Sequence, residues 1–183
     1  SHLSIKAEQT LYAGIISNWI IWQPSGSLWH PYNVDKVFSR GVENSLALDY
    51  RNRNIRIESA LGYTLTRATK LKAEQNNAGT EGNQLIYVPK HKGSASFGLG
   101  YKSASLNYHH VFTGLRYEDP SNMLSVKGYT LGNLIISEEI TIGKSVLNIH
   151  LYINNIWNVS YQVIAWYPMP GRNIMAGITY KFN

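Results

Sequence analysis

The sequence of 183 residues contains no cysteine, has few charged residues and has no long apolar run. Without cysteine, neither a disulfide scaffold nor a Cys-ligated zinc site can form. No stretch approaches the roughly 18 apolar residues that a transmembrane helix needs. The first residues, Ser1 to Lys6, lack the basic region and apolar core of a signal peptide. We therefore expect either that the protein is not exported or that its natural start lies elsewhere.

Charged residues make up 15% of the chain, against roughly 25% in an ordinary soluble domain. The 17 Lys and Arg outnumber the 11 Asp and Glu, which gives a formal charge of +6. In the sequence these basic residues are scattered and form no block or helix-face stripe. A nucleic-acid partner is not expected, because it requires a clustered basic footprint.

Polar and apolar residues alternate along most of the chain, which is the period of a half-buried β-strand. No helical period of comparable length is present. The pattern predicts an all-β protein of about eight strands joined as hairpins. The expected strands lie within 3–15, 42–50, 55–65, 95–101, 106–112, 129–142, 147–153 and 174–182.

Short turns alternate strictly with long loops between these strands. The short turns are expected at 51–54, 102–103 and 143–145. All six prolines fall in the long loops or at their edges, so we expect none inside a strand. This arrangement is typical of a transmembrane β-barrel, in which long loops face the outside of the cell. The long loops are expected at 24–33, 70–84, 113–127 and 160–172.

Aromatic residues gather near both ends of the expected strands, as in the two aromatic girdles of a membrane barrel. A soluble β-barrel would instead use its aromatic residues in the core. It would also carry more charge on its solvent face than segments such as Ser94–Gly100 supply. The membrane barrel is therefore the favoured interpretation.

Two motifs lie near the C-terminus: Asn154–Asn158 followed by Tyr161, and Tyr167–Arg172. They are similar to the Asn-Leu-Phe-Asn element and the Tyr-Pro-x-Pro-Gly-Arg element of TonB-dependent outer-membrane receptors, so the C-terminal part of the chain resembles that family. Residues Gly177, Tyr180 and Phe182 match the C-terminal barrel-assembly signal. The segments 87–92, 39–43 and 19–33 are also similar to the family, the last one to receptors of the Bacteroides group that include BtuB-like transporters.

The resemblance implies an antiparallel up-and-down barrel of 22 strands with a plug in its lumen. Residues 1–183 would form its C-terminal portion, about eight strands, without the plug domain and the TonB box. The implied function is active uptake of a large scarce nutrient, such as cobalamin or a ferric siderophore, across the bacterial outer membrane. The implied partners are the remaining barrel strands and plug, TonB, outer-membrane lipid, the barrel-assembly machinery and a surface lipoprotein.

Aromatic residues of the long loops are the candidate contacts for the transported ligand. Alternatively, these aromatic side chains only anchor the barrel in the membrane interface. We interpret Arg116, Glu118 and Asp119 as solvated surface. The candidate ligand contacts are Trp29, Tyr32, Tyr117, Trp166 and Tyr167.

No catalytic motif, metal-ligand spacing or phosphate-binding loop is present in the sequence, so neither an enzyme nor a cofactor is expected. Two alternatives remain open. One is a complete eight-stranded barrel, acting as an anchor or an enzyme, in which the first and last strands pair with each other. The other is a soluble β-barrel that binds a small ligand.

Overall fold

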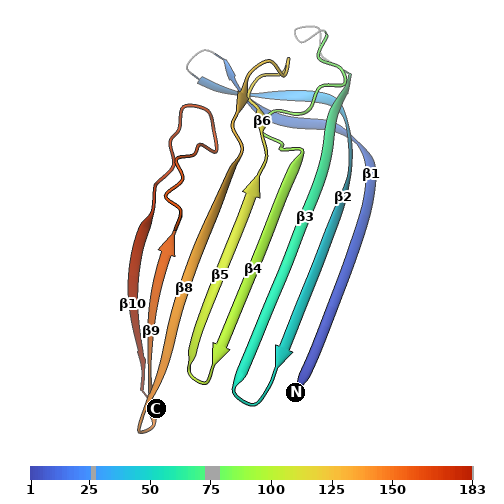
Figure 1. The fold of residues 1–183 in the computed structure, drawn as a ribbon. Coiled ribbons are helices and arrows are strands. Elements are labelled where there is room, and N and C mark those ends of the chain that lie inside the picture. The colour runs from blue at the N-terminus through green and yellow to red at the C-terminus, as the bar shows by residue number, and fades with distance from the viewer. Residues whose placement is uncertain (26–27, 73–78, 183) are drawn as a thin grey trace.

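The computed structural model describes residues 1–25, 28–72 and 79–182. One antiparallel sheet contains eight strands in the order in which they occur along the chain (Figure 1). This topology confirms the predicted all-β, up-and-down architecture, and every expected strand coincides with one of the eight, the last of which ends one residue earlier than predicted, at Lys181. Their bounds are β1 His2–Ser25, β2 Leu28–Arg51, β3 Ile55–Lys72, β4 His91–Tyr101, β5 Ala104–Thr113, β8 Tyr129–Ile142, β9 Ser145–Asn154 and β10 Asn173–Lys181.

A small second sheet pairs β6 (Arg116–Tyr117) with β7 (Ser125–Val126) inside the connection between β5 and β8. Within the described residues, the structure has no helix long and apolar enough to cross a membrane.

The strand register places most of the large apolar residues of the strands on one face of the sheet. Directly opposite residues of antiparallel strands share a face, so Leu11, Val42 and Leu65 form one apolar row across three strands. The next row, of Thr10, Glu43 and Thr64, lies on the other face and is polar. The alternation in the sequence therefore becomes a sheet with an apolar and a polar side, as expected for a wall between lipid and lumen.

The three short turns lie where they were predicted. The N–H of Asn52 donates to the carbonyl of Ile55 at 2.8 Å. Lys102 and Gly143 adopt positive φ angles of 53° and 62°, the left-handed conformation that tight hairpins require. All three turns join neighbouring strands at one end of the sheet, so the long connections meet at the opposite end.

The predicted loop at 24–33 is wrong, because β1 and β2 remain paired up to Ser25 and Leu28. Beyond Asn18, whose φ is 56°, the two strands form a distal arm (residues 19–25 and 28–34) that crosses the loop end of the sheet (Figure 1). Pro24 and Pro31 consequently lie inside strands, contrary to expectation. The arm is a two-stranded ribbon with free outer edges, where a missing N–H costs no ladder hydrogen bond. Residues 26–27 of the predicted loop lie outside the described residues.

The other long connections are loops largely as predicted, although the second one is displaced along the chain, because β3 extends to Lys72 and β4 begins only at His91. Of that loop, residues 73–78 lie outside the described residues.

The sheet is open. In the described ranges, β1 pairs only with β2 and β10 pairs only with β9, so both outer strands keep unpaired edges. The closed eight-stranded barrel therefore does not form, because it requires β1 and β10 to pair. A strand edge with free N–H and C=O groups is able to pair with another strand. Both edges of the sheet are therefore available for such pairing.

The compact core lies at the loop end. Val37, Ala68 and Leu85 are buried together, and Ile21 of the distal arm packs against them with Val88. Both faces of the sheet itself remain accessible, and many of its large apolar side chains are exposed. Packing within the chain is therefore concentrated where the loops meet.

Candidate functional site

Three loop segments and the distal arm meet at the same end of the sheet: residues 79–90, 114–128 and 155–172 (Figure 1). The arm is held there by a ring contact between Trp29 and Tyr87, whose centroids are 5.9 Å apart. The N–H of Tyr87 donates to the carbonyl of Tyr117 at 2.8 Å and so links the first two loops. We call this assembly the loop cluster.

Arg116 joins two of these loops from a buried position. Its side chain is 3% exposed and donates to three main-chain carbonyls, those of Lys127, Gln162 and Val163, each at 3.0 Å. The guanidinium lies 5.0 Å from the centroid of the Tyr129 ring, a cation–π arrangement. Burial lowers the pKa of Arg116. The interpretation of Arg116 as solvated surface is therefore wrong: it connects loop 114–128 to loop 155–172.

A second connection joins loop 79–90 to loop 114–128. The buried side chain of Gln84 accepts from the N–H of Ala68 and donates to the carbonyl of Val88. The Asn122 side chain forms hydrogen bonds with the N–H and the carbonyl of Gln84. The side chain of Asn83 donates to the carbonyl of Pro120 at 3.0 Å. These bonds fix both loops against β3.

Asp119 organises the turn between β6 and β7. Its carboxylate accepts from the main-chain N–H groups of Ser121 and Leu124, at 3.0 and 2.6 Å, and from the Ser121 hydroxyl. Burial raises the pKa of Asp119, but these hydrogen bonds outweigh it and the net pKa is lowered. The carboxylate thus acts as a structural acceptor.

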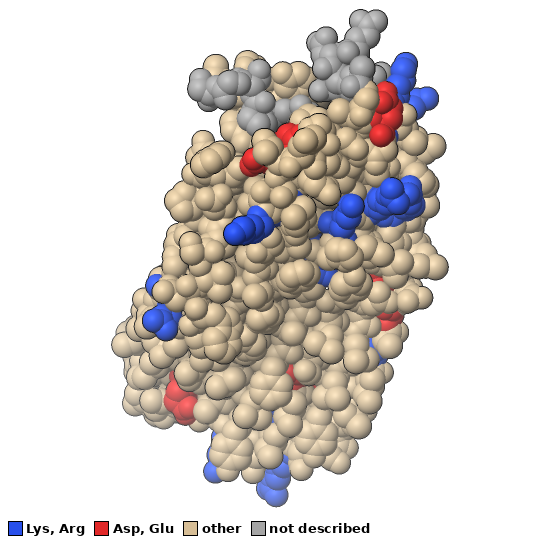
Figure 2. All heavy atoms as spheres, turned by 45° about the horizontal axis from the view of Figure 1, so that its top comes forward, with Lys and Arg blue, Asp and Glu red and all other residues tan. Residues whose placement is uncertain are grey.

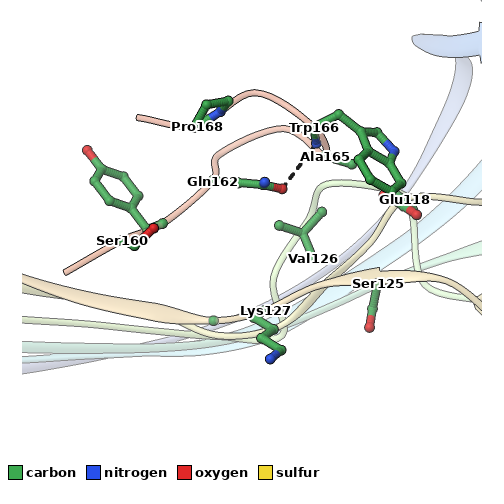
Figure 3. Close-up of a pocket in the computed structure, with 11 residues that line it drawn as sticks. Glu118, Ser125, Val126, Lys127, Ser160, Gln162, Ala165, Trp166 and Pro168 are labelled. Atoms are coloured by element: carbon green, nitrogen blue, oxygen red, sulfur yellow. Dashed lines mark hydrogen bonds between the residues drawn. The ribbon is translucent and has the colours of Figure 1, made fainter. Parts of the chain in front are cut away.

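A pocket of about 440 Å³ opens between loops 114–128 and 155–172 (Figure 3). Gln162 lies between its two sides, and its Oε1 accepts from the N–H of Trp166 at 3.1 Å. Trp166 has a φ of 68° and is 87% exposed, so its ring is displayed at the rim. The pocket is lined by Glu118, Ser125, Val126, Lys127, Gly128, Ser160, Tyr161, Gln162, Ala165, Trp166 and Pro168.

Of the five predicted ligand contacts, only Trp166 lines this pocket. Trp29 packs on Tyr87, and the Tyr117 ring lies 5.8 Å below the Lys90 ammonium. Tyr32 lies in the distal arm, opposite Ile21, and Tyr167 is exposed beside the pocket.

The sequence analysis did not single out Gln162, and it named Tyr161 only as part of a family motif and not as a ligand contact; the two residues lie four and five residues before Trp166. Their proximity in sequence to Trp166 was the signal available for finding them. Within the described residues, no group of three His, Asp or Glu side chains could hold a metal ion.

The predicted assembly-signal residues lie on the edge strand or just beyond it. Gly177 is opposite His150 on the polar face, and Tyr180 is opposite Leu147 on the apolar face. The Phe182 ring follows β10 and meets Tyr180 edge-on, with centroids 4.6 Å apart. The role of these residues in assembly stays a prediction.

Comparisons with known proteins place the chain in a family. A family model described as "TonB dependent receptor-like, beta-barrel" matches residues 8–156. The ferrioxamine B receptor of Salmonella typhimurium strain SL1344 is 26% identical over 164 residues, which is 83% of this chain and 22% of the receptor. The vitamin B12 transporter BtuB of Photobacterium profundum is 24% identical over 190 residues, covering 100% of this chain and 28% of the transporter.

A solved structure has the same fold. The siderophore receptor PiuA of Acinetobacter baumannii superposes with a TM-score of 0.67 at 20% identity, covering 97% of this chain and 26% of that receptor. The chain thus spans about a quarter of the length of the proteins it matches. Proteins of this family are β-barrels of the bacterial outer membrane, which is also where this chain is located. The open sheet, its apolar face and the family match agree: the chain belongs to the TonB-dependent receptor-like β-barrel family.

Proposed function

We propose that residues 1–183 form the C-terminal portion of a receptor barrel that takes up a large, scarce nutrient, such as a ferric siderophore or cobalamin. The observation that carries the proposal is the open sheet, with two unpaired edges and an interlocked loop cluster at one end. An open edge calls for the remaining strands of a larger barrel, and the loop cluster suits the binding of a ligand at the outer mouth.

In such a receptor the two faces of the sheet have different roles. The apolar face contacts lipid, and the polar face lines the lumen, where a plug would be accommodated. On the polar face, a hollow of about 590 Å³ includes Glu8, Glu43 and Lys92, which offer charged contacts to a plug. TonB, acting on the plug, would then open a path for the bound ligand.

We place the ligand contact at the loop pocket and at Trp166. A bulky residue rarely adopts a positive φ, and such strain is found preferentially at functional sites. Here the strain displays an indole ring that is 87% exposed beside Gln162 and Glu118. An exposed indole offers a stacking surface to a large ligand, and the neighbouring polar groups supply hydrogen bonds that orient it.

The test measures binding of ferric ferrioxamine B and of cobalamin to the intact receptor purified in detergent. We expect one of them to bind, and Trp166→Ala to weaken that binding about tenfold, equivalent to ~1.4 kcal/mol. Trp166→Phe keeps a ring and should retain part of the affinity. Trp157→Phe is the matched control, because Trp157 bonds Tyr108 on the apolar face and not the pocket. If neither ligand binds, the proposed substrate class is wrong. If Trp166→Ala binds the ligand as tightly as the wild type does, the proposed ligand site is wrong.

A further inference from the structure

A pair of amide side chains lies on the apolar face of the sheet. Gln9 of β1 is directly opposite Asn44 of β2, and Gln9 Nε2 donates to Asn44 Oδ1 at 2.7 Å. Directly opposite residues share a face, and residues two apart along a strand point to the same side, so this amide pair lies between two apolar rows. The flanking rows are Leu11 with Val42 toward the loop end and Ala7 with Leu46 toward the short turns.

The depth of the amide pair places it inside the membrane. Asn44 is six residues from Tyr50, which is on the same face at the short-turn end. At about 3.3 Å per residue and a strand tilt of about 40°, this separation corresponds to about 15 Å along the membrane normal. The apolar band of a membrane barrel is about 25 Å tall and is bordered by aromatic residues such as Tyr50. The two amides therefore lie among the acyl chains, where water is not available as a hydrogen-bond partner.

The single hydrogen bond between Gln9 and Asn44 leaves most of their polar groups without a partner. An amide side chain has two N–H donors and a carbonyl oxygen that accepts. With the residues that the structure describes, neither side chain forms a further hydrogen bond. Unsatisfied polar groups are costly in lipid, and polar residues within the membrane generally serve a contact or a function.

Other polar side chains of the same face avoid this cost. The Ser59 hydroxyl donates to the carbonyl of Ser96 at 3.2 Å. Tyr63, which is directly opposite Asn44, forms a hydrogen bond of 2.8 Å through its hydroxyl to His91 Nδ1, nearer to the loop end. The amides are too short to reach toward the membrane surface in this way. They therefore call for a partner at their own depth.

We propose that the amide pair is the centre of an interface between two copies of the receptor. Both copies have the same orientation in the membrane, so the two-fold axis of a closed dimer runs along the membrane normal. A group beside that axis meets the same group of the other copy at the same depth. Amides are self-complementary because each one donates and accepts. Asn44 Nδ2 of one copy can donate to Gln9 Oε1 of the other, and the reverse bond forms by symmetry.

The surroundings of the amide pair favour a second copy over a charged partner. Both flanking rows are apolar, and most of the surface that Figure 2 presents is uncharged. Leu11 and Leu46 are 71% and 43% exposed, so they can pack against the other copy on either side of the amides. Tilted strands of two barrels cross where they touch, which concentrates the contact at one depth. The proposal depends on the outer-membrane location of the barrel and not on which nutrient it takes up.

The test measures association of the intact receptor in phosphatidylcholine vesicles, through energy transfer between donor-labelled and acceptor-labelled copies at several protein-to-lipid ratios. We expect a reversible dimer. Gln9→Met/Asn44→Leu replaces the amides by apolar side chains of similar size and should raise the dissociation constant about fivefold or more. Gln9→Asn/Asn44→Gln keeps both amides and should retain most of the association. Ser59→Ala is the matched control, because it removes a polar group of the same face that is already satisfied, and it should associate like the wild type.

A second measurement locates the interface. Residues 1–183 contain no cysteine, so Asn44→Cys introduces a thiol of known position at the expected two-fold axis. Under oxidation it should form a disulfide with the same residue of the other copy. Phe97→Cys places a thiol on the same face of β4, away from the axis, and should not form this disulfide.

Folding of the variants is checked through the heat resistance of the barrel during gel electrophoresis. As a monomer, Gln9→Met/Asn44→Leu should be at least as heat resistant as the wild type, because apolar side chains suit the lipid face. A lower heat resistance would show that strands outside residues 1–183 satisfy the amides within one barrel, and would overturn the proposal. So would a receptor that is monomeric at every ratio, or a dimer that the double variant leaves unchanged. Nutrient binding should be the same in all variants, so this proposal and the proposed function fail independently.

Discussion

Asn122 pairs with the main chain of Gln84 in the manner of a neighbouring strand. The N–H of Gln84 donates to Asn122 Oδ1 at 2.9 Å, and Asn122 Nδ2 donates back to the Gln84 carbonyl at 3.0 Å. Asn122 adopts a φ of 60°, which asparagine tolerates better than most residues. One side chain thus supplies two of the hydrogen bonds that join two loops distant in sequence.

Substitution of Asn122 should therefore loosen the loop cluster without unfolding the sheet. Asn122→Ala removes both bonds and leaves partly buried main-chain groups unsatisfied, at a cost of about 1–3 kcal/mol. We expect faster hydrogen exchange at the Gln84 amide, with β4 and β5 unchanged. Asn122→Gly also lacks both hydrogen bonds, but glycine adopts the positive φ without strain. Comparison with Asn122→Ala therefore separates the loss of the hydrogen bonds from backbone strain. Exchange at the Gln84 amide as slow as in the wild type in both variants would show that the two hydrogen bonds do not stabilise the loop cluster.

Removal of the Arg116 side chain should release loop 155–172 from loop 114–128. Arg116→Met keeps the apolar volume but loses three hydrogen bonds, each from a charged donor and worth about 1.5–3 kcal/mol where it is buried. The released loop should be cleaved faster by protease near Val163, while the barrel keeps its heat resistance. Arg116→Lys has a compact ammonium that cannot reach all three carbonyls, so its rate of cleavage should lie between those of the wild type and Arg116→Met. Protection equal to the wild type in Arg116→Met would contradict this role.

Local patterns predicted the strands and short turns because each depends on residues close together in sequence. The alternation around Leu61 and Phe97 and the turn at Lys102 are examples. The distal arm was missed because Pro24 and Pro31 are ordinarily signals against a strand, and only the ribbon's free edges make them acceptable.

Features that depend on distant residues could not be predicted. Arg116 is buried because of loop 155–172, more than forty residues away. Likewise, Arg40 and Arg67 look scattered in sequence, and only the β2–β3 register brings them together. Trp166 was identified from its residue type and loop position, whereas the pocket beside it requires two loops to meet.

The turn held by Asp119 should respond to pH. The pKa of Asp119 lies below its ordinary value of 3.8 in the folded chain. Its stabilising effect is therefore fully present above about pH 4 and is lost as the pH falls through the folded-state pKa. At about pH 6, Asp119→Asn should speed hydrogen exchange at the Leu124 amide relative to the wild type. This difference should vanish at a pH below the folded-state pKa of Asp119, where the wild-type side chain is also uncharged. Glu118→Gln is the control and should not change the profile; a difference that persists in acid would contradict the prediction.

Gly41 should tolerate no side chain, because the Tyr12 ring lies over it on the polar face. A Cβ at Gly41 would meet the carbonyl oxygen of Leu65, and Tyr12 Oη and Cζ at 2.5 and 2.7 Å. The Tyr12 hydroxyl is also held by Thr66 Oγ1 at 2.9 Å, so the ring cannot move away without breaking that bond.

We expect Gly41→Ala to lower the free energy of unfolding by about 1–3 kcal/mol, the usual cost of overpacking. The urea midpoint of the folded barrel in micelles measures this change. Gly14→Ala is the matched control, because a Cβ at Gly14 meets nothing within 4 Å in the same sheet. Adding Tyr12→Ala to Gly41→Ala should recover only part of the loss, since the contact with the Leu65 carbonyl remains. If Gly41→Ala and Gly14→Ala have the same midpoint, the close approach of Tyr12 to Gly41 does not constrain the sheet.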